Sequence, residues 1–226
     1  MKKTAVLIDA GFLRGFLPRN VGFADLARII EGFALACVSP DHGEEIHRVL
    51  YYDCPPYDGP GHNKRHPIEP TRTPNSPGQR NFWNSVLHTL KGKPYFAVRL
   101  GELSFDGWTL TERALSDVLS CRRAPVADDF APVLRQKGVD LRIGIDVAFM
   151  AKDKLVDRIV VVSGDADMIP AMKAARREGV QVVLATLGHR VKASLKEHAD
   201  LYRDVDVPAV IANLYPDGLP VRPSRN

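Results

Sequence analysis

The sequence predicts an α/β sandwich, in which a mainly parallel central sheet is covered by helices on both faces. Short apolar runs typical of buried strands alternate with segments whose apolar residues recur at helical spacing. The chain has 226 residues, of which 45% are hydrophobic and 26% charged, enough apolar mass for one medium-sized core. These observations favour one folded domain over several small ones.

The regular elements follow in order along the chain. The run "TAVLID" at 4–9 is continuously apolar, as expected for a buried parallel strand. In the first half we expect a strand at 4–9, a helix at 23–38 and a strand at 45–53. In the second half we expect a helix at 139–153, a strand at 158–164, a helix at 169–179 closed by Gly179, a strand at 180–187 and a helix at 190–200.

Residues 54–80 interrupt this alternation. They contain seven prolines and several bases without apolar periodicity, so we expect a long loop and not a second core. After it, 81–90 is expected to be helical, and 95–111 to form a hairpin at the sheet edge that turns at Asp106–Gly107. The expected organisation is one domain at 1–214 with an insertion at 54–80, followed by a Pro-rich tail at 215–226.

Composition excludes several classes of protein. The start "MKKTAVLIDAGFL" has only a short apolar run broken by Asp9, so it predicts neither a signal peptide nor a membrane span, and a cytoplasmic location is the expectation. The three cysteines are far apart, which argues against a disulfide framework or a structural zinc site. A net charge of +4 leans only slightly toward anionic partners. The edge hairpin and the tail offer surfaces for a homodimer.

Several aspartates stand where a parallel sheet gathers its ligands. Asp9 ends the first strand, Asp165 follows a later one, and Asp140 opens a helix whose start reaches the same edge. An aspartate that ends a buried apolar strand is unfavourable unless it is paired or binds a cation. A divalent cation would turn the mutual repulsion of these acids into attraction, so the sequence predicts a metal site of Asp9, Asp140 and Asp165.

Each acid also has a structural explanation. Asp167 is well placed to cap the helix that follows, and Asp140 suits the first turn of a helix dipole. Asp146 lies six residues after Asp140, about 120° around the helix, so these two side chains do not simply point the same way. Asp146 could face solvent or pair with a base.

The motifs together resemble a known family. The segments "VLIDAGFL", "KGVDLRIGIDVAFMA", "VVVSGDADMIPAMKAARREGVQVVLAT" and "LKEHAD" are similar, in this order, to the NYN-domain family (the LabA-like group) of PIN-like ribonucleases. The resemblance implies a PIN-like three-layer sandwich with an aspartate pocket that holds Mg²⁺ or Mn²⁺ for RNA cleavage. By motif, Asp9, Asp140 and Asp165 match the principal acids, and Asp146 and Asp167 match secondary catalytic acids. Many members place Asn two or three residues after the first Asp, where this chain has "DAGF".

The expected activity is that of a metal-dependent endoribonuclease acting on single-stranded or structured RNA. Divalent cations held by carboxylates activate water and neutralise the charge that develops on the phosphoryl oxygens. Bases near the edge are candidates for phosphate contacts, although each could be an ordinary surface base; they are Arg14, Lys137, His189 and Arg190. Ser163 could hydrogen-bond a ligand water or cap its turn. Bases and rings of the long loop could clamp a strand or be solvated, namely Tyr57, Lys64, Arg65, His66 and Arg72.

Rival functions fit less well. Haloacid dehalogenases carry Asp-x-Asp on an early strand, where this chain has Asp9 followed by Ala10 and Gly11. No glycine-rich phosphate-binding motif occurs at a strand-to-helix turn, which disfavours dinucleotide-binding enzymes and P-loop NTPases. The alternative of another class is a PIN-like module that binds RNA or a protein with little or no turnover.

Overall fold

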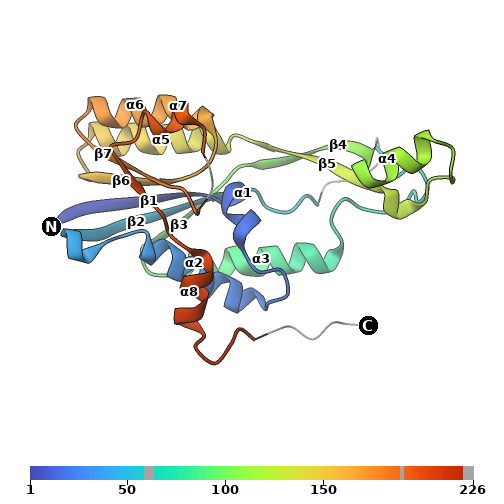
Figure 1. Ribbon diagram of the computed structural model, residues 1–226, viewed down its shortest axis with the longest axis horizontal. Coiled ribbons are helices and arrows are strands. Elements are labelled where there is room, and N and C mark those ends of the chain that lie inside the picture. The colour runs from blue at the N-terminus through green and yellow to red at the C-terminus, as the bar shows by residue number, and fades with distance from the viewer. Residues whose placement is uncertain (59–63, 189–190, 221–226) are drawn as a thin grey trace.

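A six-stranded sheet in the order β3-β2-β1-β6-β7-β8 forms the centre of the molecule (Figure 1). The computed structural model describes residues 1–58, 64–188 and 191–220. The strands are β1 (Lys2–Asp9), β2 (Glu44–Asp53), β3 (Phe96–Leu100), β6 (Arg158–Val162), β7 (Gln181–Ala185) and β8 (Leu201–Arg203). Neighbouring strands pair in parallel, which confirms the predicted α/β sandwich.

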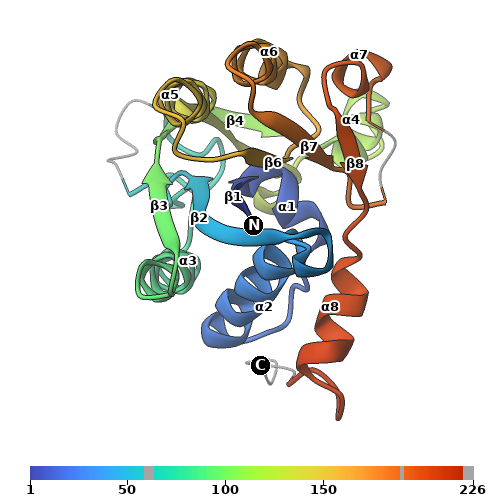
Figure 2. The same ribbon diagram turned by 90° about the vertical axis from the view of Figure 1, so that its left-hand side faces the viewer.

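Helices cover both faces of this sheet (Figure 2). One face carries α1 (Ala10–Leu13), α2 (Phe23–Ala36), α3 (Pro77–Lys91) and α8 (Val207–Leu214), and the other carries α5 (Val139–Lys152), α6 (Ile169–Arg177) and α7 (Ala193–Lys196). Side chains of β1 alternate between the two layers, because successive strand residues point to opposite faces. Val6 and Ile8 pack on the α2–α3 side, and Ala5 and Leu7 on the α5–α6 side. Both faces are therefore buried.

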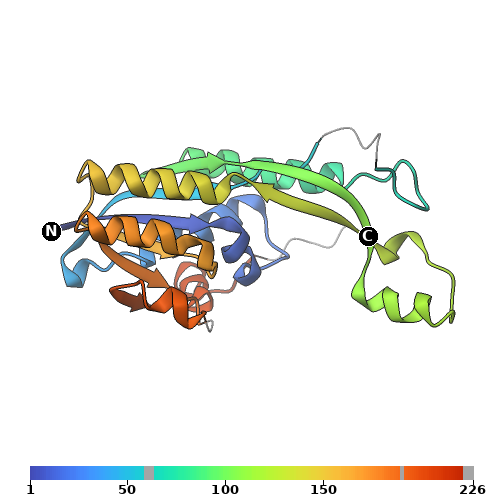
Figure 3. The same cartoon turned by 90° about the horizontal axis from the view of Figure 1, so that it is seen from above.

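A two-stranded arm extends from this body (Figures 1 and 3). It consists of the antiparallel strands β4 (Glu102–Leu110) and β5 (Phe130–Lys137), with α4 (Glu112–Leu119) at its far end. The predicted turn at Asp106–Gly107 is wrong. The chain runs straight through this point as one strand with a bulge, where the register shifts between Phe105 and Gly107 and Gly107 has φ 119°. The β3 part of the predicted hairpin joins the main sheet instead.

The Pro-rich segment is only partly a free loop. His66 is 1% exposed and its ring lies 4.5 Å from that of Trp108 on β4. Lys64 Nζ donates to the carbonyl of Phe105 at 2.8 Å, and Arg72 pairs with Asp128. The side chains considered as a strand clamp are thus largely engaged with the arm. Residues 59–63 lie outside the described residues.

Two boundaries near the ends of predicted helices differ from expectation. Helix α3 begins at Pro77, inside the expected loop, because Ser76 and Gln79 form a reciprocal capping box at its start. The helix expected at 190–200 is only α7, after which the chain returns to the sheet as β8. Short 3₁₀ helices fill other connections: η1 (Arg14–Phe16), η2 (Pro40–His42), η3 (Ala127–Asp129) and η4 (Ala166–Met168). No helix in the described ranges has the length and apolarity to cross a membrane.

Candidate active site at the carboxyl edge of the sheet

Acids from several elements gather where the central strands end. Asp9 is the last residue of β1 and Asp53 the last of β2, and Asp9 pairs in register with Tyr52. Asp165 follows β6, and Asp140 lies in the first turn of α5. Because β1, β2 and β6 are parallel neighbours, their carboxyl ends lie along one edge. The sequence therefore places its acids together through strand order.

Asp9 links β1, α1 and the loop after β6. Its Oδ1 accepts hydrogen bonds from the backbone N–H of Gly11 at 2.9 Å and of Phe12 at 3.4 Å, which caps α1. Its Oδ2 accepts from Ser163 Oγ at 3.3 Å. Burial raises the pKa of Asp9, and the charge of Asp140 raises it further, although these hydrogen bonds act in the opposite direction. Hydrogen bonds hold the carboxylate in place, and no base among the described residues neutralises it.

The pKa of Asp140 is affected by the charges of two further acids. Partial burial raises its pKa, and the charges of Asp165 and Asp167 add to the shift. Asp165 Oδ1 accepts from the backbone N–H of Asp167 at 3.0 Å and caps η4, so the capping role considered for Asp167 belongs to Asp165. We name Asp9, Asp140, Asp165 and Asp167 the acid cluster. Within the described ranges, no basic side chain forms an ion pair with any of them.

The carboxylates of the acid cluster are ligands of the kind that Mg²⁺ or Mn²⁺ prefers, but no three of them lie close together. In the part of the chain that the structure describes, no three His, Cys, Asp or Glu side chains lie close enough together to hold an ion. Magnesium, however, usually keeps several waters and binds through one or two carboxylates plus substrate phosphates. Unpaired carboxylate oxygens that repel one another fit such an open site, in which water and substrate complete the coordination.

Asp53 is an acid that sequence reasoning missed. It is 0% exposed, its Oδ2 accepts from Arg14 Nη2 at 2.5 Å, and its Oδ1 accepts from the N–H of Cys54 at 2.7 Å. Burial raises its pKa to about 6 even though Arg14 lowers it. The signal was present, because Asp53 ends an apolar strand just as Asp9 does.

Arg14, predicted to contact phosphate, is partly engaged by this neighbour. Its guanidinium lies 4.0 Å above the ring of Trp83, and its Nε is buried without a hydrogen-bond partner. The side chain is still 31% exposed. Arg14 is therefore held in a fixed orientation by Asp53 and Trp83, with part of its side chain open to solvent.

Gln136 on β5 is the second residue that the sequence did not reveal. A Cβ atom added at Gly11 would lie 3.2 Å from Asp9 Oδ1 and 3.4 Å from Gln136 Oε1. The amide of Gln136 and the carboxylate of Asp9 therefore both border the space that a side chain at position 11 would occupy. No signal pointed to it, because β5 itself was not predicted.

The remaining predicted residues fall in different places. Ser163 donates to Asp9 and accepts from the N–H of Asp165 at 3.1 Å, so it ties two acids of the cluster together. Lys137 ends β5, is exposed and lies shortly before Asp140 in the chain. His189 and Arg190 lie outside the described residues.

Asp146 is not brought to the acid cluster. Its Oδ2 accepts from the hydroxyl of Tyr52 at 2.9 Å and from Arg99 Nε at 3.1 Å. Its charge is not among those that shift the pKa of Asp9 or Asp140. The structure gives Asp146 a bridging position between α5, β2 and β3.

Comparison with known proteins supports the family resemblance. Residues 102–206 match the NYN domain family, a segment that contains Asp140, Asp165 and Asp167. No curated protein matches the chain. A crystal structure of a protein of unknown function from Vibrio parahaemolyticus is similar at 19% identity and a TM-score of 0.45, over 91% of this chain and 93% of that one. The NYN resemblance inferred from the motifs is confirmed for the matched segment.

Proposed function

Because residues 102–206 carry an NYN domain, which belongs to the PIN-like nuclease superfamily, we propose that this protein is a metal-dependent ribonuclease. It hydrolyses RNA phosphodiester bonds at the acid cluster, within a unit formed by residues 1–214. The observation that carries the proposal is the electrostatics of this cluster. Burial raises the pKa of Asp9 and of Asp140; the charge of Asp140 adds to the rise at Asp9, and those of Asp165 and Asp167 add to the rise at Asp140, with no basic partner in the described ranges.

The chain's own side chains prepare the site for this reaction. A divalent cation, when bound, lowers the pKa of water and neutralises developing charge on the phosphate. Asp9, Asp140 and Asp165 would hold it, with Asp167 as a further carboxylate at the same edge. Ser163 fixes the Oδ2 side of Asp9, and the amide of Gln136 stands ready to hydrogen-bond a phosphate oxygen or a water.

Bases around the cluster would bind the substrate. Lys137 is exposed next to the start of α5, and the open part of the Arg14 guanidinium is oriented by Asp53 and Trp83. Such contacts to phosphate fix the position of a strand without reading its sequence. Arg190 remains a candidate for the same role on sequence grounds.

The proposal is tested with labelled RNA and DNA, single- and double-stranded, in manganese, magnesium or chelator. We expect cleavage of RNA only with metal, and its loss in Asp165→Asn, since the amide keeps the cap but removes the charge. Asp146→Asn is the matched control, because it changes an aspartate of the neighbouring motif that lies outside the cluster. Wild-type cleavage by a folded Asp165→Asn protein, or cleavage in chelator, would refute the assignment.

A second candidate is a PIN-like module that binds RNA without efficient turnover. It is favoured by the absence, among the described residues, of three acids close enough to hold an ion. It predicts RNA binding that is equal with and without metal, and no cleavage under any of these conditions.

A further inference from the structure

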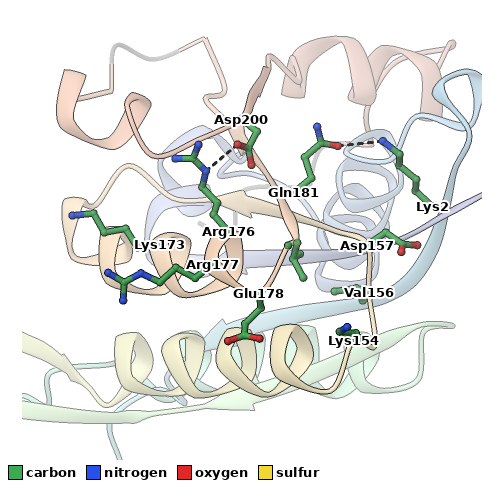
Figure 4. A pocket seen from close by; sticks show the side chains of 12 residues that line it. Lys2, Lys154, Val156, Asp157, Lys173, Arg176, Arg177, Glu178, Gln181 and Asp200 are labelled. Atoms are coloured by element: carbon green, nitrogen blue, oxygen red, sulfur yellow. Dashed lines mark hydrogen bonds and ion pairs between the residues drawn. The ribbon is translucent and has the colours of Figure 1, made fainter.

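A wide concavity lies at the other edge of the sheet, away from the acid cluster. It is an open groove of about 1040 Å³, where α5 and α6 end and β6 and β7 begin (Figure 4). Its lining is formed by Lys2, Lys154, Val156, Asp157, Lys173, Arg176, Arg177, Glu178, Gly179, Val180, Gln181 and Asp200. We call it the basic groove, since its cations outnumber its anions. None of the acid cluster lines it.

The carboxylates of the basic groove are mostly engaged. Asp200 accepts from Arg176 Nε at 2.9 Å and from the N–H of Val182 at 2.8 Å, and Figure 4 shows Arg176 turned toward it. Asp157 accepts from the N–H of Lys3 at 2.8 Å. Glu178 is then the remaining acid of the lining.

The cations of the groove are mostly free. In the described part of the chain, Lys154, Lys173 and Arg177 have no carboxylate within ion-pair distance, and Lys2 Nζ contacts only the neutral Gln181 side chain at 3.4 Å. Lys173 and Arg177 are four residues apart on α6, so they share one side of the helix (Figure 4). Uncompensated positive charge therefore faces an open groove.

Lys154 stands at a backbone position that favours glycine. It follows the last turn of α5 with φ 50°, whereas Gly179 follows the last turn of α6, at the same edge, with φ 83°. Both helices end with the same backbone pattern, since Leu155 bonds back to Met150 and Val180 to Ala175. Glycine is the residue that this left-handed position favours, and a lysine there is strained. The ends of the helices alone do not explain the lysine.

We propose that the basic groove binds backbone phosphates of the RNA strand whose scissile bond lies at the acid cluster. This inference rests on the proposed function. The lining has no aromatic ring on which a base could stack, so the groove would recognise phosphate and not sequence. The eight residues of β1 span about 26 Å at about 3.3 Å per residue, and only an RNA long enough to reach both edges would gain from the groove.

The test measures binding of labelled RNAs of about 4 and about 16 nucleotides in chelator, so that no cleavage is needed. The groove variant combines Lys154→Gly, Lys173→Ala and Arg177→Ala, and Lys154→Gly is also tested alone. Lys91→Ala is the matched control, because Lys91 is an exposed base in the last turn of α3 that does not line the groove. Inorganic phosphate and AMP serve as free-phosphate probes.

We expect the groove variant to bind the long RNA about tenfold more weakly and to bind the short RNA as wild type does. The slope of log affinity against log salt should fall by about 2, since each lost contact to a single strand removes about 0.7. Lys154→Gly alone should weaken long-RNA binding several-fold while its melting temperature stays the same or rises. If Lys154 had a purely structural role, Lys154→Gly would leave long-RNA binding unchanged and lower the melting temperature.

Three results for the groove variant would overturn the inference. It could bind the long RNA as tightly as Lys91→Ala does, or lose affinity equally for the short and the long RNA. It could also lose affinity for AMP or phosphate while binding both RNAs as wild type does. Failure of the proposed function looks different. If wild type cleaves no RNA but the groove variant still loses long-RNA binding, the groove stands and the nuclease assignment falls. If wild type cleaves RNA and the groove variant binds the long RNA normally, the nuclease assignment stands and the inference about the groove falls.

Discussion

Two carboxylates at opposite edges of the same sheet differ in whether arginine side chains pair with them. Glu44 begins β2 and is 1% exposed, and it accepts from Arg203 Nη2 at 2.6 Å, from Arg158 and from the N–H of Ser39. Asp9 ends β1, and its donors among the described residues are backbone N–H groups and the Ser163 hydroxyl; burial raises its pKa, and the charge of Asp140 adds to the rise. At the amino edge, two arginines therefore neutralise a buried acid.

The difference separates structural from functional acids. A buried carboxylate that serves the fold is surrounded by cations, whereas the acid cluster at the carboxyl edge forms no ion pair within the described ranges, at some cost to stability. Asp53 is intermediate, because it is buried like Glu44 but pairs with Arg14 as its one ion-pair partner among the described residues. The three positions make the comparison testable.

The largest expected effect is at Glu44. Replacing it with Gln leaves Arg158 and Arg203 facing one another without their shared anion, which should destabilise the fold by about 3 to 5 kcal/mol. Asp9→Asn, which keeps its cap, should not be destabilising. Urea unfolding of both variants measures this, and a larger loss in Asp9→Asn than in Glu44→Gln would reverse the comparison.

The next effect concerns Asp53 and pH. Its pKa rises from 3.8 in the unfolded chain to about 6 in the fold, so its protonated form stabilises the native state. This contribution is fully present below pH 4 and is lost as pH rises through about 6, by up to about 3 kcal/mol. Unfolding free energies of wild type and Asp53→Asn, measured from pH 4 to 7, should differ by an amount that changes over this window. If the difference in unfolding free energy between wild type and Asp53→Asn did not change with pH, the raised pKa of Asp53 would be contradicted.

A smaller effect is expected at Gln136. Replacing it with Leu should lower the rate of RNA cleavage about tenfold, which corresponds to a barrier higher by about 1.4 kcal/mol. The reason is that an amide near the acid cluster is lost while β5 keeps its backbone hydrogen bonds. The control is the melting temperature, which should change little, since β5 belongs to the arm and not to the main sheet. Full activity would leave Gln136 without a role in the reaction.

The sequence allowed most of the main sheet to be predicted, and little of the arm. Strands such as 4–9 and helices such as 23–38 were correct because continuous apolar runs and helical spacing are local signals. The arm depends on a bulge at Gly107 and on a partner strand at 130–137, which no local pattern revealed. The cluster acids were named because they stand at strand ends or helix starts, whereas Gln136 comes near Gly11 through the arm. Asp146 lies apart because Tyr52 and Arg99 hold it, a contact between distant segments.

The most direct test of the central claim, that Asp9 and Asp165 are kept unpaired for a cation, is a set of thermal melts. Wild type, Asp9→Asn and Asp165→Asn are each melted in chelator and in increasing manganese. In chelator, both variants should melt slightly higher than wild type, because one pKa unit of mutual repulsion is worth about 1.4 kcal/mol and the amide still caps its helix. Manganese should raise the melting temperature of wild type with concentration, and raise that of the variants less. Equal metal-induced shifts in all three proteins would contradict the account.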